Sequence, residues 1–98
     1  MSVVVRDDPP RQRYEAWLDG RVAGFVAYET AGGLVMLTHT EVDPAFEGRG
    51  VGSALVRAVL DEIRESGREV VPLCPFVKAW IGRNPAYADL VHQGTPST

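Results

Sequence analysis

The sequence predicts an α/β (α+β) fold, in which one mixed sheet combines an antiparallel meander with a strand, helix, strand crossover. Three observations support this class. Alternating apolar residues on both sides of Asp19-Gly20 predict a hairpin. Residues 51–63 have the apolar spacing of an amphipathic helix, and a short apolar segment follows at 69–73. A strand, a helix and another strand within this length imply a right-handed connection between parallel neighbours.

Length and composition are those of one soluble globular domain. The chain has 98 residues, of which 45% are hydrophobic and 23% charged, and it contains no apolar run of the roughly 20 residues that a membrane helix needs. Charges at positions 6–8 come too early for a signal peptide, so we expect a cytoplasmic protein with no membrane partner. We expect residues 1–92 to form a single domain and the polar residues 93–98 to be a disordered tail.

Charge and cysteine content argue against several classes of function. The net charge of -3 gives no general attraction to nucleic acid, so no nucleic-acid partner is expected. Cys74 is the single cysteine, which excludes an internal disulfide, and the only histidines are His39 and His92. Because a closed zinc site needs about four ligands, we predict no metal site. The sequence leaves the oligomeric state open.

The first half of the chain predicts the meander. Residues 3–6 are a short apolar start, and 7–10 (Asp-Asp-Pro-Pro) predict a loop, because strand and helix interiors tolerate proline poorly. A strand over 13–18 is expected to place on one face Tyr14, Ala16 and Leu18. Its partner over 21–30 is expected to have a bulge at Gly24, with Phe25 on one side and, on the other, Val22, Val26 and Tyr28.

The third long strand and the elements after it complete the predicted fold. Strict alternation over 34–42 puts on one face Val35, Leu37, His39 and Glu41, and on the other Met36, Thr38, Thr40 and Val42. A helix is predicted from about Gly50 to Ser66, with Gly67 as its C-terminal cap. After the strand at 69–73, a second helix is predicted from Pro75 to Asn84, and residues 87–91 predict a further turn.

A glycine-rich loop at 47–53 (Glu-Gly-Arg-Gly-Val-Gly-Ser) joins the third long strand to the first helix. Glycine lets the backbone approach a ligand closely, and the first turn of a helix presents amides and a positive dipole end to anions. A phosphate-bearing ligand is therefore expected. The loop lacks the Gly-Lys-Ser/Thr ending of a P-loop, and it fits the dinucleotide fingerprint poorly, since position 53 is serine and several strands precede it.

The loop resembles that of the GNAT superfamily of N-acetyltransferases, whose acyl-CoA loop follows the pattern (Gln/Arg)-x-x-Gly-x-(Gly/Ala). Residues 47–52 match this pattern except at Glu47, where Gln or Arg is usual. The flanking segments 39–42 (His-Thr-Glu-Val) and 72–76 (Pro-Leu-Cys-Pro-Phe) are similar to those of a short, single-domain GNAT-like family. The resemblance covers about residues 21–91 and implies a GNAT-like mixed sheet in a minimal version, without the usual extra terminal elements.

The same resemblance implies acetyl-CoA as the cofactor and a primary amine as the acceptor. The coenzyme-binding residues to which it points are Val42, Arg49, Gly50, Val51, Gly52 and Ser53. Arg49 has an alternative interpretation as a solvated loop charge, and Lys78 and Arg83 are either phosphate contacts or part of a solvated helix face. The amine acceptor is expected to be a small molecule or a protein. Because this chain lacks the elements that wall the acceptor site in longer members, the acceptor side should be open, which suits a large acceptor such as a protein chain, a site completed by another subunit, or a protein that binds acyl-CoA with little chemistry.

The catalytic candidates are His39, Glu41 and Cys74. Acyl transfer to an amine needs a base, stabilisation of the thioester oxygen, and an acid for the leaving thiolate. Histidine titrates near neutrality, and GNAT enzymes often use a glutamate on this strand; a structural histidine and a solvent-facing carboxylate are the alternatives. Cys74 is a nucleophile, an acid or an inert buried cysteine. Tyr87 is a leaving-group acid or a packing aromatic.

Three hypotheses of function follow. The first is an enzyme that transfers acetyl from acetyl-CoA to a primary amine. The second is a module that binds coenzyme A or its thioester with little or no turnover. The third is an interaction domain in which the glycine loop has only a structural role.

Overall fold

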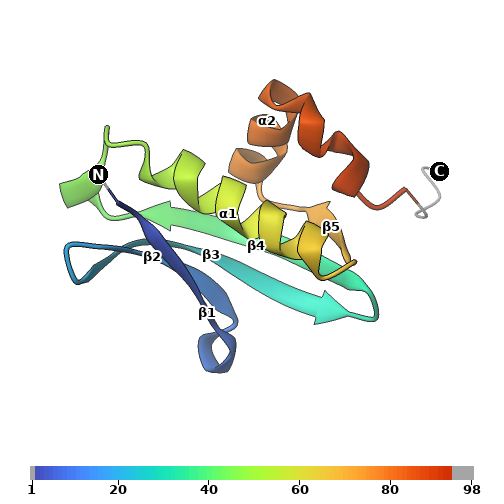
Figure 1. The fold of residues 1–98 in the computed structure, drawn as a ribbon, viewed down its shortest axis with the longest axis horizontal. Coiled ribbons are helices and arrows are strands. Elements are labelled where there is room, and N and C mark those ends of the chain that lie inside the picture. The colour runs from blue at the N-terminus through green and yellow to red at the C-terminus, as the bar shows by residue number, and fades with distance from the viewer. Residues whose placement is uncertain (1, 94–98) are drawn as a thin grey trace.

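A computed structural model describes residues 2–93 as a five-stranded mixed sheet with helices packed against it (Figure 1). The strands follow one another across the sheet in chain order. The strands are β1 Val4–Asp8, β2 Arg13–Leu18, β3 Arg21–Ala31, β4 Leu34–Val42 and β5 Glu69–Pro72. The α-helices are α1 Val51–Glu65 and α2 Pro75–Arg83, and short 3-10 helices are η1 Pro9–Arg11, η2 Pro44–Phe46 and η3 Pro85–Leu90.

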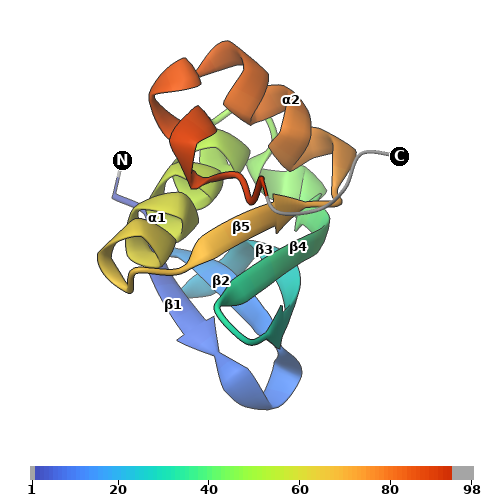
Figure 2. The ribbon, with the colours of Figure 1, turned by 90° about the vertical axis from the view of Figure 1, so that its right-hand side faces the viewer.

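The sheet has the mixed character predicted from the sequence. β1 to β4 pair antiparallel, whereas β5 lies parallel to β4, from the pair Leu34 and Glu69 to the pair Leu37 and Pro72. The connection between the parallel strands contains α1, which covers one face of the sheet (Figures 1 and 2). The predicted fold class, an antiparallel meander followed by a crossover, is therefore confirmed.

The N-terminal strand is longer than the sequence suggested. Residues Asp7 and Asp8, predicted to lie in a loop, pair with Tyr14 and Arg13 as the end of β1. Their side chains are satisfied in place, because the Tyr28 hydroxyl donates to Asp7 at 2.6 Å and Arg11 donates to Asp8 at 2.9 Å. An edge strand has one unpaired side and accommodates such residues more easily than a central strand. The two prolines, Pro9 and Pro10, follow the strand and form the first residues of η1.

The predicted β2–β3 hairpin is present, and its turn residues Asp19 and Gly20 have φ values of 52° and 74°. The bulge, however, lies one residue before the predicted position. Ala16 pairs with Gly24 and Trp17 with Val22, so Ala23 is the extra residue. Ala23 is fully buried, and Val22 lies with Phe25 in the wall of a surface pocket. The prediction that Val22 shares a face with Val26 is wrong, since a bulge shifts the alternation of the strand.

A second bulge changes the faces of β4. Ala27 pairs with His39 and Tyr28 with Leu37, which leaves Thr38 as the extra residue. Val35 and Leu37 are fully buried, whereas His39 and Glu41 beyond the bulge are exposed. The predicted common face of Val35, Leu37, His39 and Glu41 is therefore wrong, because one inserted residue shifts a period of two by half a cycle.

The main core lies between the sheet and the apolar face of α1. The seven buried residues of α1 are Val51, Gly52, Leu55, Val56, Val59, Leu60 and Ile63.

Gly67 forms the predicted C-terminal cap of α1, with a φ of 76°. The amide of Gly67 donates to the carbonyl of Arg64 and that of Arg68 to the carbonyl of Ile63, at 3.1 and 3.3 Å. These two bonds form a Schellman motif, which satisfies carbonyls at the helix end.

The C-terminal part closes the other edge of the sheet. α2 contributes buried Val77, Trp80 and Ile81, and the turn predicted at 87–91 falls largely within η3. Val91 bridges to Val70, and the amide of His92 donates to the carbonyl of Val70 at 2.9 Å. Of the predicted tail at 93–98, residues 94–98 lie outside the described part of the chain. No helix within residues 2–93 is long and apolar enough to cross a membrane.

Candidate functional site

β4 and β5 separate at the bulge of Thr38. Their pairing ends at Leu37 and Pro72, and the amides of Leu73 and Cys74 both donate to the carbonyl of Leu37, at 3.0 and 2.9 Å. Beyond this point β4 continues to Val42 while the other chain turns into α2. The two parallel strands therefore splay at their carboxyl ends, where open α/β sheets commonly hold ligands.

The glycine loop follows the free end of β4 after the short helix η2. Gly48 and Gly50 have φ values of 81° and 75°, and Gly50 is the N-cap of α1. No side chain in the described residues caps this end, and the first helical bond runs from the amide of Ala54 to the carbonyl of Gly50 at 3.0 Å. The amides of residues 51–53 precede that bond, as is normal for a helix start. They form a positively polarised first turn that favours anions.

The remaining loop residues have packing roles that the sequence did not reveal. A side chain at Gly52 would lie 2.9 Å from the Cζ of Phe76 and 3.5 Å from Val42. Gly52 thus lets β4, α1 and α2 meet closely. The hydroxyl of Ser53 accepts a hydrogen bond from the indole of Trp80 at 2.9 Å, which ties α1 to α2. The guanidinium of Arg49 lies 5.6 Å from the ring centre of buried Phe46, and it is exposed to solvent.

Cys74 lies at the splay, at the N-cap of α2 and only 4% exposed. Its sulfur is 3.3 Å from the hydroxyl of Thr40 on β4. Burial raises the pKa of the thiol, but hydrogen bonds from Thr40 and from the amides of Val77 and Phe76 outweigh burial, so that the net pKa is below its usual value. The lowered pKa and the helix N-terminus are typical of a reactive cysteine, whereas the burial of the side chain is typical of a structural one.

His39 and Glu41 form a pair on the other face of β4. The Nε2 of His39 lies 2.9 Å from an Oε of Glu41, and the two side chains are 59% and 61% exposed. The ring of Phe25 meets that of His39 edge to face, with centres 6.2 Å apart. After the Thr38 bulge, His39 and Glu41 lie on one face of β4, and Thr40, beside Cys74, lies on the other.

The remaining candidates lie on α2 and η3. The hydroxyl of Tyr87 donates to Asp61 of α1 at 2.8 Å, and its ring packs edge to face on Trp80. The hydrogen bond to Asp61 and burial raise the pKa of Tyr87. Lys78 and Arg83 are exposed on α2. No group of three or more potential metal ligands occurs within residues 2–93.

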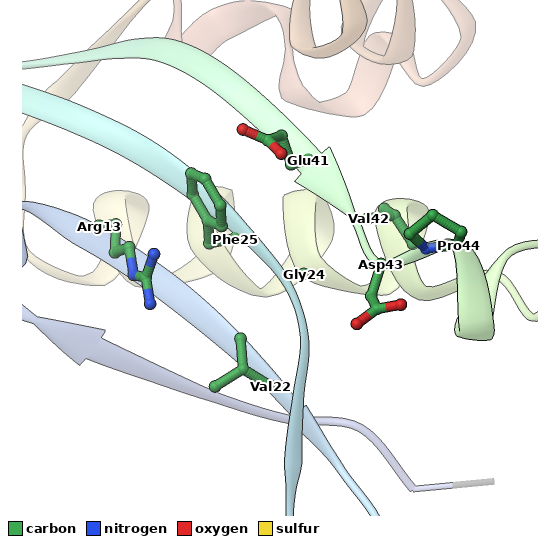
Figure 3. A pocket seen from close by; sticks show the side chains of 8 residues that line it. All are labelled: Arg13, Val22, Gly24, Phe25, Glu41, Val42, Asp43 and Pro44. Atoms are coloured by element: carbon green, nitrogen blue, oxygen red, sulfur yellow. The ribbon is translucent and has the colours of Figure 1, made fainter.

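A surface pocket that the sequence did not predict adjoins the His39 and Glu41 pair (Figure 3). It has a volume of 320 Å³ and opens on the sheet face turned away from α1. It forms where β3 and β4 approach closely, since a side chain at Gly24 would lie 2.7 Å from the carbonyl oxygen of Glu41. The lining residues are Arg13, Val22, Gly24, Phe25, Glu41, Val42, Asp43 and Pro44. The sequence signal that could have indicated the pocket is the spacing of two acidic residues, Glu41 and Asp43, two positions apart at the end of the predicted strand.

Comparisons with known proteins agree with this architecture. Residues 13–90 match the family described as GCN5-related N-acetyl-transferase. Protein NATD1 from Xenopus tropicalis is 31% identical over 86 residues, which cover 86% of this chain and 79% of that protein. Mycothiol acetyltransferase from Clavibacter sepedonicus is 44% identical over 55 residues, which cover 56% of this chain and 18% of that enzyme.

A solved structure supports the fold independently. A GCN5-like protein from Staphylococcus aureus, whose solution structure was determined by NMR, superposes with a TM-score of 0.70 at 20% identity. The superposition covers 96% of this chain and 91% of that protein, so it spans the sheet and both helices. Together with the family match over most of the chain, it shows that this protein belongs to the GCN5-related N-acetyltransferase (GNAT) family.

Proposed function

We propose that this protein transfers the acetyl group of acetyl-CoA to a primary amine. The observation that carries the proposal is the glycine loop: Gly48 and Gly50 adopt left-handed conformations that leave the first amides of α1 without a side-chain cap, next to the splay that holds Cys74. Family membership supports the same reaction class.

The loop fits a coenzyme with phosphate groups. Residues 47–50 are exposed, and a side chain at Gly48 or Gly50 would meet nothing within 4 Å, so the backbone is open to a ligand. The residues that would hold the coenzyme are Val42, Arg49, Gly50, Val51, Gly52 and Ser53. Their contribution is mainly through backbone amides and the helix dipole. When bound, acetyl-CoA supplies an acetyl group activated as a thioester.

The residues of the chain supply the proton transfers. His39 and Glu41 form the base that takes a proton from the ammonium group of the acceptor. The amine nitrogen then bonds to the acetyl carbon while the bond from that carbon to sulfur breaks, and the surplus proton on the new amide nitrogen passes to solvent, from which Cys74 regains the proton that it donates. The leaving thiolate needs a proton, for which the Cys74 thiol, beside Thr40, is the candidate donor. In an alternative route, Cys74 takes the acetyl group first and passes it to the amine.

One observation favours a second function, a coenzyme-binding module without useful turnover. The His39 and Glu41 pair is exposed on one side of β4, whereas Cys74 is buried on the other, next to Thr40. An acceptor held at the His39 and Glu41 pair would therefore lie on the opposite side of β4 from Cys74. This arrangement is compatible with coenzyme binding even where no acceptor is held.

Thermal unfolding with added ligands tests the shared part of both functions. A ligand that binds only the folded state stabilises it by about 2.7 kcal/mol at one hundred times its Kd. We expect acetyl-CoA and coenzyme A to raise the unfolding temperature and ATP to raise it less. If millimolar acetyl-CoA and coenzyme A leave it unchanged, both functions are excluded. Mass spectrometry of amines incubated with acetyl-CoA and the protein then separates the enzyme from the binding module.

A further inference from the structure

The indole of Trp80 decides which hydrogen-bonding role is left to the hydroxyl of Ser53. An indole N–H can only donate, so the Ser53 oxygen accepts the bond between them, which is 2.9 Å long. Among residues 2–93 the indole is the only hydrogen-bond partner of this hydroxyl. A hydroxyl carries one proton, and the bond from Trp80 does not use it. The hydroxyl is therefore anchored to α2 through its oxygen, while its proton is available to a further acceptor.

Ser53 lies in the part of α1 that favours an anion. It is the third residue of the helix, and its amide precedes the first helical bond, which runs from Ala54 to Gly50. The residue is exposed, so its hydroxyl is accessible from solvent. Phosphate oxygens are strong acceptors. The available hydroxyl proton thus adds a side-chain donor to the backbone amides of the same helix turn.

The packing of Trp80 fixes the direction of its N–H. The side chain of Trp80 is buried, and the ring of Tyr87 meets it edge to face with centres 5.2 Å apart. The guanidinium of Arg57 lies 5.2 Å from the centre of the indole. The side-chain amide of Asn84 donates to the carbonyl of Trp80 at 2.8 Å and holds the end of α2. The indole is therefore oriented by these neighbours and not only by its bond to Ser53.

We infer that Trp80 is a positioning residue of the coenzyme site, which holds the Ser53 hydroxyl so that its proton is donated to a phosphate group of coenzyme A. Trp80 acts through Ser53. A carbonyl or carboxylate in place of the indole would take the hydroxyl proton and leave only lone pairs toward the phosphate. The inference rests on the proposed function, in which the loop binds acetyl-CoA, and adds a residue outside the loop to that site.

Calorimetric titration with coenzyme A tests the coupling between the two residues. Ser53→Ala should raise the Kd about five- to tenfold, through the loss of one charge-assisted contact at an exposed site. Trp80→Phe should raise it about two- to fivefold, because the hydroxyl is still present but must be ordered on binding. In the Ser53→Ala background, Trp80→Phe should have no further effect. Such non-additivity is expected when one residue acts through another.

Shorter ligands separate positioning from a general packing effect. Pantetheine carries the thiol arm of coenzyme A without its phosphates, and its Kd is obtained by competition with coenzyme A. We expect Ser53→Ala and Trp80→Phe to leave the Kd of pantetheine unchanged. Dephospho-coenzyme A keeps the pyrophosphate and lacks only the phosphate on the ribose. An effect retained with this ligand supports the inference with the pyrophosphate as the acceptor, and one lost with it supports the inference with the ribose phosphate.

Trp17→Phe is the matched control, because it makes the same chemical change on β2. The indole of Trp17 donates to Glu15 at 3.2 Å, so this variant also removes a bonded N–H, and it should keep the native affinity for coenzyme A. The chain has two tryptophans. The single indole N–H resonance of Trp17→Phe therefore belongs to Trp80. Coenzyme A should shift this resonance, because hydrogen bonds in a chain polarise one another, and should shift it much less when Ser53→Ala is added.

The outcomes distinguish the inference from the function on which it rests. If the native protein does not bind coenzyme A, the proposed function fails. If it binds, the inference alone is overturned by native affinity in Ser53→Ala, by additive effects of the two substitutions, or by an equal loss of affinity for pantetheine. If Trp80→Phe does not fold, the resonance of the Trp80 indole decides: an unchanged position at saturating coenzyme A overturns the inference.

Discussion

The hydroxyl of Thr40 lies 3.3 Å from the sulfur of Cys74, and this contact spans the gap that opens between β4 and α2. It exists because the bulge at Thr38 turns Thr40 toward the helix side of the sheet. With the amides of Phe76 and Val77, it offsets the effect of burial and lowers the pKa of the thiol.

Replacing Thr40 by valine should raise the pKa of Cys74, because valine has a similar shape but no hydroxyl. The rate of alkylation by iodoacetamide, measured against pH, reports the thiolate fraction and should shift to higher pH in Thr40→Val. Thr38→Val is the control, since the Thr38 hydroxyl donates to Ala27 and not to the thiol. Identical profiles for Thr40→Val and the native protein would show that the hydroxyl does not stabilise the thiolate.

The lowered pKa also predicts how pH affects stability. A group whose pKa is lower in the folded state stabilises the fold above its unfolded pKa, here near 9.0, and this contribution is lost as the pH falls through the folded pKa. The native protein should therefore gain stability relative to Cys74→Ala as the pH rises toward 9. Denaturant melts of both proteins across that interval measure it, and a constant difference would contradict the prediction.

The two routes for acetyl transfer make opposite predictions for Cys74. If Cys74 takes the acetyl group, incubation with acetyl-CoA alone should add one acetyl mass to the peptide that contains it. Direct transfer gives no such adduct, and His39→Ala should then lower turnover by roughly 10²- to 10⁴-fold, the usual contribution of a general base. We expect direct transfer, because a thioester and an amine react once they are aligned. Full activity in both Cys74→Ala and His39→Ala would remove both residues from the mechanism.

Gly50 offers a test of the coenzyme loop that keeps the fold. Its φ of 75° suits aspartate and asparagine better than other side chains, and a new side chain there meets nothing within 4 Å. Gly50→Asp should abolish coenzyme A binding by placing negative charge at the phosphate position, whereas Gly50→Asn should weaken it less. Both should cost about 1 kcal/mol of stability. Calorimetric titration checks the difference, and equal affinities would place the phosphate elsewhere.

A buried tyrosine predicts sensitivity to alkali. Burial, followed by the negative charges of Glu62 and Asp7, raises the pKa of Tyr14 to about 12. Because the pKa is higher in the folded state, the stabilising contribution is complete below the unfolded pKa near 10 and is lost as the pH rises toward 12. Tyr14→Phe should lose less stability over that interval in urea melts. A parallel decline of both proteins would mean that other groups cause the loss.

The sequence predicted the elements well because their signals are local. The hairpin at Asp19-Gly20, the apolar face of α1 and the cap at Gly67 each depend on residues close together in the chain. The missed strand residues Asp7 and Asp8 are stabilised by Tyr28 and Arg11, and the bond to Tyr28 spans distant parts of the sequence. Propensity alone could not identify these partners.

The candidate site was harder to predict because two bulges control it. Alternation in 34–42 placed His39 with Leu37, and only the pairing with β3 reveals that Thr38 is inserted. The pocket depends on the close approach of Gly24 to Glu41, a contact between neighbouring strands. The assignments of His39, Glu41 and Cys74 to catalysis, and of the loop to acetyl-CoA, remain predictions for the experiments above.

The bulge at Thr38 makes the length of β4 as important as its composition. A chain that lacked this one residue would pair evenly with β3, and every later side chain of the strand would change sides at once. His39 and Glu41 would turn toward α1, while Thr40 and Val42 would face solvent. Substitutions can alter this site one residue at a time, but a single in-frame codon deletion would dismantle it in one event. Related chains that differ by one residue in β4 would therefore carry a different site on the same fold.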